Sequence, residues 1–210
     1  MKILLTGFVP FGKHKLNPSE EVVKRLAESK LEGVELATAI LAVHPTEAPE
    51  KLLHIFDESK PDAVLLLGES GGYASPTLER VFVNILEYPA ELGGGVALND
   101  GVLEPAGPAA YLATFPFRDI QERVLKAGLP IRLSLSAGTY ICNQVGYTIL
   151  HAIHRRKLQV PAGLIHLPFI PSQAATLAAI GAYPSMALET LCQVTSIAVE
   201  TMAKKRAEMA

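Results

Sequence analysis

The chain has 210 residues, of which 49% are hydrophobic, and a formal net charge of -2 at pH 7. This length and apolar content fit one compact domain, so we expect residues 1–210 to form a single domain. Acidic and basic side chains are mixed along the sequence, which argues against nucleic acid as a partner.

The N-terminal segment carries no signal that would direct the chain to a membrane or out of the cell. Its apolar run at residues 3–5 is far too short to span a bilayer, and no signal-peptide cleavage site follows. The two cysteines, Cys142 and Cys192, are too few for a disulfide framework and are expected to be thiols. We therefore expect a cytoplasmic protein with no membrane partner.

Short apolar runs alternate with helical patterns in the first third of the chain. Residues 2–8, 34–43 and 62–68 are predicted to be strands, the first and third of them buried. A helix is predicted to begin at Asn17, and a second one to follow Pro45. These segments indicate successive βα units.

The middle of the chain is less regular. Residues 77–86 are rich in β-branched and aromatic side chains and predict a strand that follows the preceding strand directly, as a mixed sheet allows. Residues 87–108 contain many Gly and Pro residues and predict a long loop. A helical pattern is expected to resume near Ala109, to break near Pro116 and to end at Gly128.

The last third repeats the alternation. Residues 131–135 predict a strand, the apolar stripe that includes Val145 predicts a helix, residues 163–169 predict the last strand, and residues 186–202 a final amphipathic helix. Together the elements predict an α/β fold, a three-layer α/β/α sandwich with a mixed, mostly parallel central sheet.

Cys142 is the first candidate for chemistry because it follows a turn, where a strand ends and a helix begins. Unpaired backbone N–H groups at a helix N-terminus stabilise a thiolate, and they can also bind the oxyanion of a tetrahedral intermediate. The alternative is a small buried apolar residue, which is how we interpret Cys192 on the last helix.

His166 is a polar side chain within an apolar strand, and its burial there requires a hydrogen-bond partner. In isolation it is a core histidine bonded to backbone, whereas a nearby thiol and carboxylate would make it a general base. His151 and His154 could be imagined as metal ligands, but no further ligand with suitable spacing completes a site. We expect neither a metal nor a cofactor.

Ser70 is the rival nucleophile, because residues 68–72 (GESGG) match the G-x-S-x-G elbow after a predicted strand. A serine hydrolase would pair Ser70 with His166 and an aspartate such as Asp100. However, an elbow leads into a helix, whereas the next predicted element here is a strand. A glycine-rich turn that contacts ligand backbone is the better interpretation, and a phosphate-binding module is weakly supported without a P-loop.

Seven short segments occur in order along the chain: TGFVPFG at residues 6–12, NPS at 17–19, ERV at 79–81, GPAAY at 107–111, AGTYICN at 137–143, IHLP at 165–168 and PSQ at 171–173. In order and spacing they resemble the pyroglutamyl peptidase I family, also called pyrrolidone carboxyl peptidases. The likeness extends from the first strand to at least Gln173.

The resemblance implies a cysteine exopeptidase that removes N-terminal pyroglutamate from peptides through a thioester intermediate. It assigns Cys142 as nucleophile, His166 as base and acid, and Glu79 as the residue that orients the histidine. Without the resemblance, Glu79 would be interpreted as an ion-pair partner of Arg80 or of a neighbouring strand. The family also implies a homotetramer.

The substrate pocket is expected to involve Phe8 and Phe11, which pack around the lactam ring in the family, together with Glu69 and Ile141. Two segments depart from the family pattern. Residues 69–73 (ESGGY) replace QAGGR, and residues 85–89 (ILEYP) replace DARIP without its arginine. A carboxylate at Glu69 accepts hydrogen bonds but donates none unless protonated. The alternative function is therefore a non-catalytic or altered-specificity ligand-binding homologue.

Overall fold

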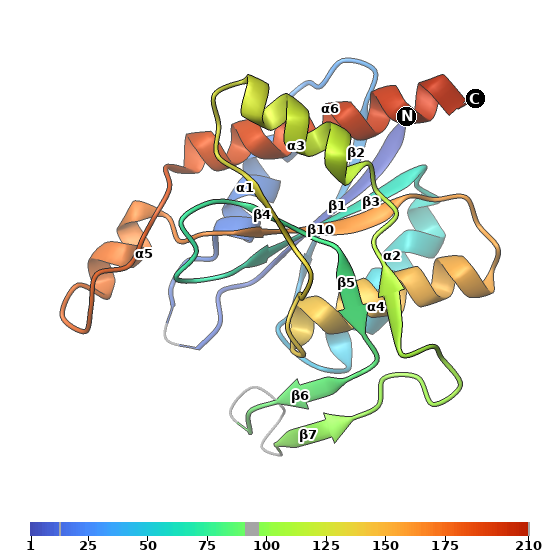
Figure 1. Ribbon diagram of the computed structural model, residues 1–210, viewed down its shortest axis with the longest axis horizontal. Coiled ribbons are helices and arrows are strands. Elements are labelled where there is room, and N and C mark those ends of the chain that lie inside the picture. The colour runs from blue at the N-terminus through green and yellow to red at the C-terminus, as the bar shows by residue number, and fades with distance from the viewer. Residues whose placement is uncertain (13, 91–96, 210) are drawn as a thin grey trace.

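A computed structural model describes residues 1–12, 14–90 and 97–209, with side chains through Lys205. A six-stranded sheet forms its centre (Figure 1). In spatial order, the sheet consists of β2 (Glu35–Leu41), β1 (Lys2–Phe8), β3 (Ala63–Glu69), β10 (Ala162–Leu167), β4 (Thr77–Glu79) and β9 (Arg132–Ser134).

The sheet is mixed. The pairs formed by β1, β2, β3 and β10 are all parallel, whereas β4 is antiparallel to β10 and parallel to β9. Strands β3 and β10 are buried on both faces because helices cover the sheet on either side. The carboxyl ends of these parallel strands lie along one edge of the sheet.

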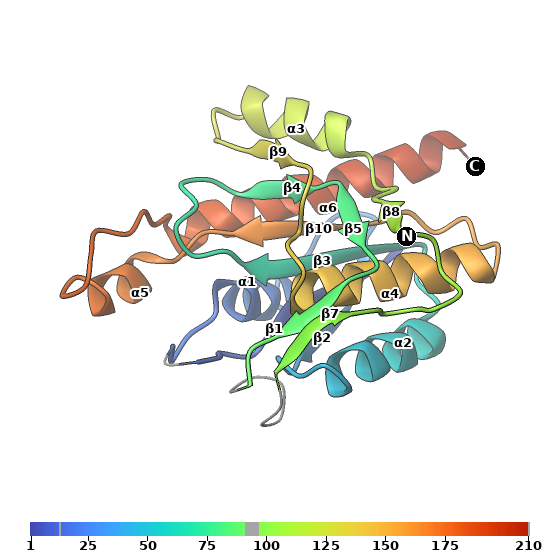
Figure 2. The same ribbon diagram turned by 60° about the horizontal axis from the view of Figure 1, so that its bottom comes forward.

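Helices form the two outer layers (Figures 1 and 2). On one face α6 (Leu188–Met209) contacts both α1 (Pro18–Ala27) and α3 (Phe117–Lys126), and on the other α2 (Glu47–Ser59) contacts α4 (Ile141–Arg155). The predicted three-layer sandwich with a mixed, mostly parallel sheet is confirmed. Among the described residues, no helix is long and apolar enough to cross a membrane.

Local sequence signals explain several element boundaries. Asn17 caps α1 by accepting a hydrogen bond from the Ser19 backbone N–H at 3.0 Å, and Pro18 occupies the first helical position. At the end of α3, Gly128 follows the C-cap with φ of +74°, a conformation that glycine adopts without strain.

The middle of the chain differs from the sequence prediction. The expected strand at residues 77–86 is divided into β4 and β5 (Val81–Val83), and the expected loop contains a two-stranded pair of β6 (Leu86–Tyr88) with β7 (Leu98–Gly101). Residues 91–96 of that expected loop, with their three glycines, lie outside the described residues.

Two further elements were also predicted wrongly or missed. The residues expected to resume a helix near Ala109 instead form β8 (Ala110–Leu112), which pairs with β5. Helix α5 (Pro171–Thr176) was not predicted. Strands of three or four residues are too short to show a hydrophobic period, so pairing with distant segments decides their structure. The six-residue α5 is also too short for such a period, although Pro171 begins it and Gln173 bonds the Ile170 N–H.

Candidate active site

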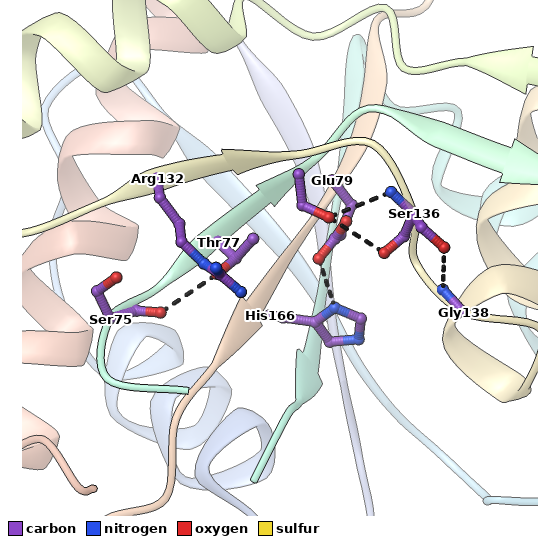
Figure 3. Close-up of polar contacts among 8 residues, drawn as sticks. Ser75, Thr77, Glu79, Arg132, Ser136, Gly138 and His166 are labelled. Atoms are coloured by element: carbon purple, nitrogen blue, oxygen red, sulfur yellow. Dashed lines mark hydrogen bonds and ion pairs between the residues drawn. The ribbon is translucent and has the colours of Figure 1, made fainter. Parts of the chain in front are cut away.

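His166 and Glu79 meet because β4 pairs with β10 in antiparallel register. Glu79 lies opposite Leu164, so it is diagonal to His166 on the same face of the sheet. Their side chains point toward each other, with His166 Nδ1 2.9 Å from Glu79 Oε1 (Figure 3). His166 is 7% exposed and Glu79 is fully buried, so the carboxylate fixes the orientation of the imidazole.

Cys142 is the second residue of α4, immediately after a structured turn. Hydroxyl groups organise this turn: Ser134 Oγ accepts from the Ser136 N–H, and Ser136 Oγ accepts from the Gly138 N–H, both at 3.2 Å (Figure 3). Gly138 has φ of +78°, which favours glycine. The helix then begins with no side-chain cap and no acidic residue in its first turn.

The start of α4 is therefore electrostatically suited to a negative charge. The first N–H groups of a helix have no acceptor within the helix, and the dipole adds partial positive charge. No capping oxygen or first-turn carboxylate competes for these groups here. They can stabilise a thiolate on Cys142 and an oxyanion next to it.

Gly68 brings the thiol and the imidazole to one place. It pairs with His166 in the parallel register of β3 and β10. A Cβ built on Gly68 would lie 2.7 Å from Cys142 Sγ and 3.2 Å from His166 Nε2. Because His166 Nδ1 bonds Glu79, it is the opposite nitrogen of the ring that faces Cys142.

Three side chains far apart in the sequence thus form a carboxylate, imidazole and thiol series. Burial alone lowers the pKa of His166, but charge and hydrogen bonding from Cys142 and Glu79 outweigh burial and raise it to about 10. A protonated His166 at this position can act as a proton donor beside the Cys142 thiol.

The family model for pyroglutamyl peptidase matches residues 1–205 of this chain. The chain belongs to the pyroglutamyl peptidase family. This family is of the cysteine peptidase class.

Named relatives agree over nearly the whole length. The pyrrolidone-carboxylate peptidase of Vibrio vulnificus is 40% identical, covering 90% of this chain and 87% of that protein. That of Thermococcus onnurineus is 38% identical, covering 97% and 100%. The solved structure of pyrrolidone carboxyl peptidase from Thermococcus litoralis has a TM-score of 0.93 at 32% identity, covering 100% of this chain and 96% of that one.

Substituting alanine for Gly68 tests the packing of this site. The new Cβ would press on Cys142 Sγ and on the His166 ring, so we expect kcat/KM for a pyroglutamyl amide to fall at least about 10²-fold. Steady-state kinetics and thermal melting would measure the effect. Gly181→Ala is the control, because a Cβ there meets only an ordinary contact at 3.4 Å. Unchanged kinetics in a folded Gly68→Ala protein would contradict the geometry.

The residues expected to line the substrate pocket have different environments. Phe8 is 2% exposed and belongs to the hydrophobic core, whereas Phe11 is half-buried beyond the carboxyl end of β1, with its ring centroid 6.1 Å from that of His14. Ile141 is buried in the first turn of α4, next to Cys142. Their contact with a substrate stays a prediction.

Glu69 is the last residue of β3 and follows Gly68 directly. Successive side chains of a strand alternate between the two faces of the sheet, so the Glu69 side chain lies on the face away from Cys142 and His166. Its Oε2 accepts a hydrogen bond from Gln173 Nε2 at 2.7 Å. Gln173 also donates to the Leu16 carbonyl at 3.0 Å and accepts from the Ile170 N–H at 3.1 Å. Gln173 therefore joins the end of β3 at Glu69, the segment before α1 at Leu16 and the start of α5 at Ile170.

Burial raises the pKa of Glu69, although Gln173 and His14 oppose the shift. A raised pKa in the folded state means that stability decreases as pH rises through that pKa. We therefore expect Glu69→Gln, which keeps an acceptor for Gln173, to melt about 1–3 °C above the wild type at pH 7.5. The difference should vanish toward pH 4 in melting curves, and the exposed Glu32→Gln should show no such trend. A Glu69→Gln protein that melts lower at pH 7.5 would contradict this account.

The rival nucleophile Ser70 and the imagined metal ligand His151 are less well placed for those roles. Ser70 lies in a turn whose next element is β4, so the helix that a nucleophile elbow needs does not follow. His151 Nδ1 lies 3.0 Å from the Tyr111 hydroxyl, and Nε2 lies 3.7 Å from Glu104. Within the described part of the chain, no cluster of three or more His, Cys, Asp or Glu could hold a metal ion.

Asn143 and Gln173 belong to segments of the family resemblance, but the sequence assigns neither of them a role, and it places Gly68 only in the G-x-S-x-G pattern. The adjacency of Asn143 to the candidate nucleophile is the one sequence signal that points to this residue.

Proposed function

We propose that this protein is a cysteine exopeptidase that removes N-terminal pyroglutamate from peptides, with Cys142 as nucleophile, His166 as acid and base, and Glu79 as the orienting carboxylate. The observation that carries the proposal is the position of His166 between Glu79, at 2.9 Å, and Cys142. Membership of the pyroglutamyl peptidase family supports the substrate class.

In the first half-reaction the Cys142 thiolate attacks the carbonyl carbon of the scissile amide bond, which joins the pyroglutamyl residue to the rest of the peptide. Negative charge moves to the carbonyl oxygen, where N–H groups in the first turn of α4 can bind it. The His166 Nε2–H then donates its proton to the leaving amine nitrogen as the C–N bond breaks. The products are a shortened peptide with a free amine and a thioester on Cys142.

In the second half-reaction water replaces the amine. Neutral His166 accepts a proton from water at Nε2 while the oxygen attacks the thioester carbonyl. The C–S bond breaks, free pyroglutamate leaves, and the thiolate and imidazolium are restored. Throughout both steps Glu79 accepts the hydrogen bond from Nδ1–H, so that Nε2 always faces the reacting atoms.

The test is hydrolysis of L-pyroglutamyl-7-amido-4-methylcoumarin under reducing conditions, compared with the L-prolyl amide. The prolyl ring has the same size but lacks the lactam carbonyl. We expect release of the fluorophore from the pyroglutamyl substrate only. Preferred cleavage of the prolyl amide, or inhibition by fluorophosphonates and not by iodoacetamide, would contradict the proposal.

A second candidate function is an altered-specificity or non-catalytic homologue, favoured by the carboxylate at Glu69. If the wild type binds pyroglutamate but does not cleave the amide, Glu69→Gln becomes the deciding variant. Restored cleavage in Glu69→Gln would support altered specificity, and continued tight binding without turnover would support the non-catalytic alternative.

A further inference from the structure

Asn143, the residue after Cys142, has a fully buried side chain whose hydrogen-bonding groups are all engaged. Its Oδ1 accepts from the Val83 N–H at 2.8 Å, and its Nδ2 donates to the Val83 carbonyl at 2.9 Å and to the Ile85 carbonyl at 3.0 Å. One amide therefore holds three backbone groups of residues 83–85. Moving this side chain would break all three bonds and leave the buried amide without partners, at a cost of about 1–3 kcal/mol.

The segment that Asn143 holds continues directly from the strand that carries Glu79. Val83 ends β5, and β5 follows β4 after one residue. A second attachment lies farther along: the Glu87 N–H donates to the Thr139 carbonyl at 3.0 Å, and the Thr139 hydroxyl donates to the Glu87 carboxylate. Residues 83–87 are thus bonded along residues 139–143 on both sides of Cys142.

These bonds relate the nucleophile to the rest of the triad. Glu79 holds His166, and Asn143 joins the helix of Cys142 to the chain that leads from Glu79. Gly68 also leaves space for Cys142, since a Cβ added at this position would lie 2.7 Å from Sγ. Cys142 consequently has little freedom to move toward or away from His166.

We propose that Asn143 is a positioning residue whose side chain fixes the first turn of α4 against residues 83–85 and thereby sets the placement of Cys142 against His166. The inference rests on the proposed function in so far as Cys142 is the nucleophile. It assigns a role to the residue that follows Cys142, which the proposed reaction steps leave unused.

The experiment compares Asn143→Leu and Asn143→Asp with wild type. Leucine has a similar volume and no polar group, whereas aspartate keeps the acceptor for the Val83 N–H. Gln144→Leu is the matched control: Gln144 is a buried amide one residue farther on, and it bonds Tyr88 at 2.6 Å and the Pro45 carbonyl at 2.7 Å instead of residues 83–85. Thermal melting identifies the folded variants.

Two readouts separate positioning from stability. The first is the iodoacetamide alkylation rate of Cys142 as a function of pH, followed on its own peptide by mass spectrometry so that Cys192 does not interfere. The second is kcat/KM for the pyroglutamyl amide. Alkylation needs no substrate, so a wild type that fails to cleave the amide would refute the proposed function and still leave the role of Asn143 measurable.

We expect kcat/KM to fall about 10²-fold in both folded Asn143 variants, as for a nucleophile displaced by about 1 Å. The alkylation midpoint should move to higher pH because the thiolate loses its imidazolium neighbour. Gln144→Leu should lower only the melting temperature. Folded Asn143 variants with a wild-type midpoint and kcat/KM within about threefold would overturn the inference, as would equal losses in Gln144→Leu.

If neither Asn143 variant folds, Thr139→Val decides the matter. It removes the hydroxyl bond to Glu87 and loosens the second attachment of the same segment. The alkylation midpoint should then shift in the same direction by a smaller amount, and an unchanged midpoint would overturn the inference.

Discussion

Replacing Cys142 by serine is expected to lower kcat/KM for a pyroglutamyl amide by at least about 10⁴-fold. Serine fits the same space, but its hydroxyl is a far weaker nucleophile without a base matched to it, and the imidazolium that supports a thiolate does not activate an alcohol. Steady-state kinetics would give the effect, and thermal melting would verify that the variant stays folded.

Cys192→Ser is the matched control for the loss of a thiol. Cys192 lies half-buried on α6, and burial raises its pKa. We expect this variant to keep wild-type kcat/KM. Substantial activity in Cys142→Ser, or loss of activity only in Cys192→Ser, would exclude Cys142 as the nucleophile.

Replacing Glu79 by glutamine is expected to reduce kcat by about 10²–10⁴-fold. The variant removes the charge that stabilises the imidazolium. It also buries an amide NH₂ where Glu79 Oε2 has no hydrogen-bond partner among the described residues, so the amide is poorly accommodated. Glu104→Gln is the control, because Glu104 pairs with His151 outside the triad. A kcat within about threefold of wild type would contradict the role assigned to Glu79.

The pH dependence of kcat/KM offers a second test of Glu79, because the direction of the expected shift can be stated. Glu79 is one of the groups that raise the pKa of His166 to about 10, so its removal lowers that pKa. In the proposed mechanism His166 must carry a proton in order to protonate the leaving amine. The alkaline limb of the kcat/KM profile should therefore move to lower pH in Glu79→Gln, whereas a change that affected only folding would leave the limb in place.

Much of the fold could be predicted from local patterns. Strands β1, β3 and β10 are largely apolar, and Asn17 and Gly128 mark the ends of helices with ordinary capping chemistry. The position of Cys142 at the start of a helix also follows from the turn residues before it. These features depend on neighbouring residues only, so the sequence contains them directly.

The contact between Glu79 and His166 could not be derived in this way. It requires β10 to lie between β3 and β4, although β3 and β4 are consecutive in the sequence, and it requires the antiparallel register that puts Glu79 diagonal to His166. Strand order is a property of the whole sheet. Family resemblance gave the pairing as an expectation, while local sequence allowed an ion pair with Arg80 equally well.

The same limit applies to Gly68 and Asn143. The role of Gly68 depends on register with His166 and on the approach of Cys142, and the role of Asn143 depends on residues 60 positions earlier in the chain. The roles of both residues come from contacts with distant segments of the chain. A hydrophobic period within the local sequence does not reveal such contacts.

The most direct test of the central claim is a titration of activity against alkylation of Cys142. The Cys192→Ser protein, which keeps Cys142 as its one thiol, would be treated with limiting iodoacetamide and assayed on the pyroglutamyl amide at each step. We predict a straight line that reaches zero activity at one label per chain, with every label on Cys142. Activity that persists in fully labelled protein would contradict the account and return Ser70 to consideration.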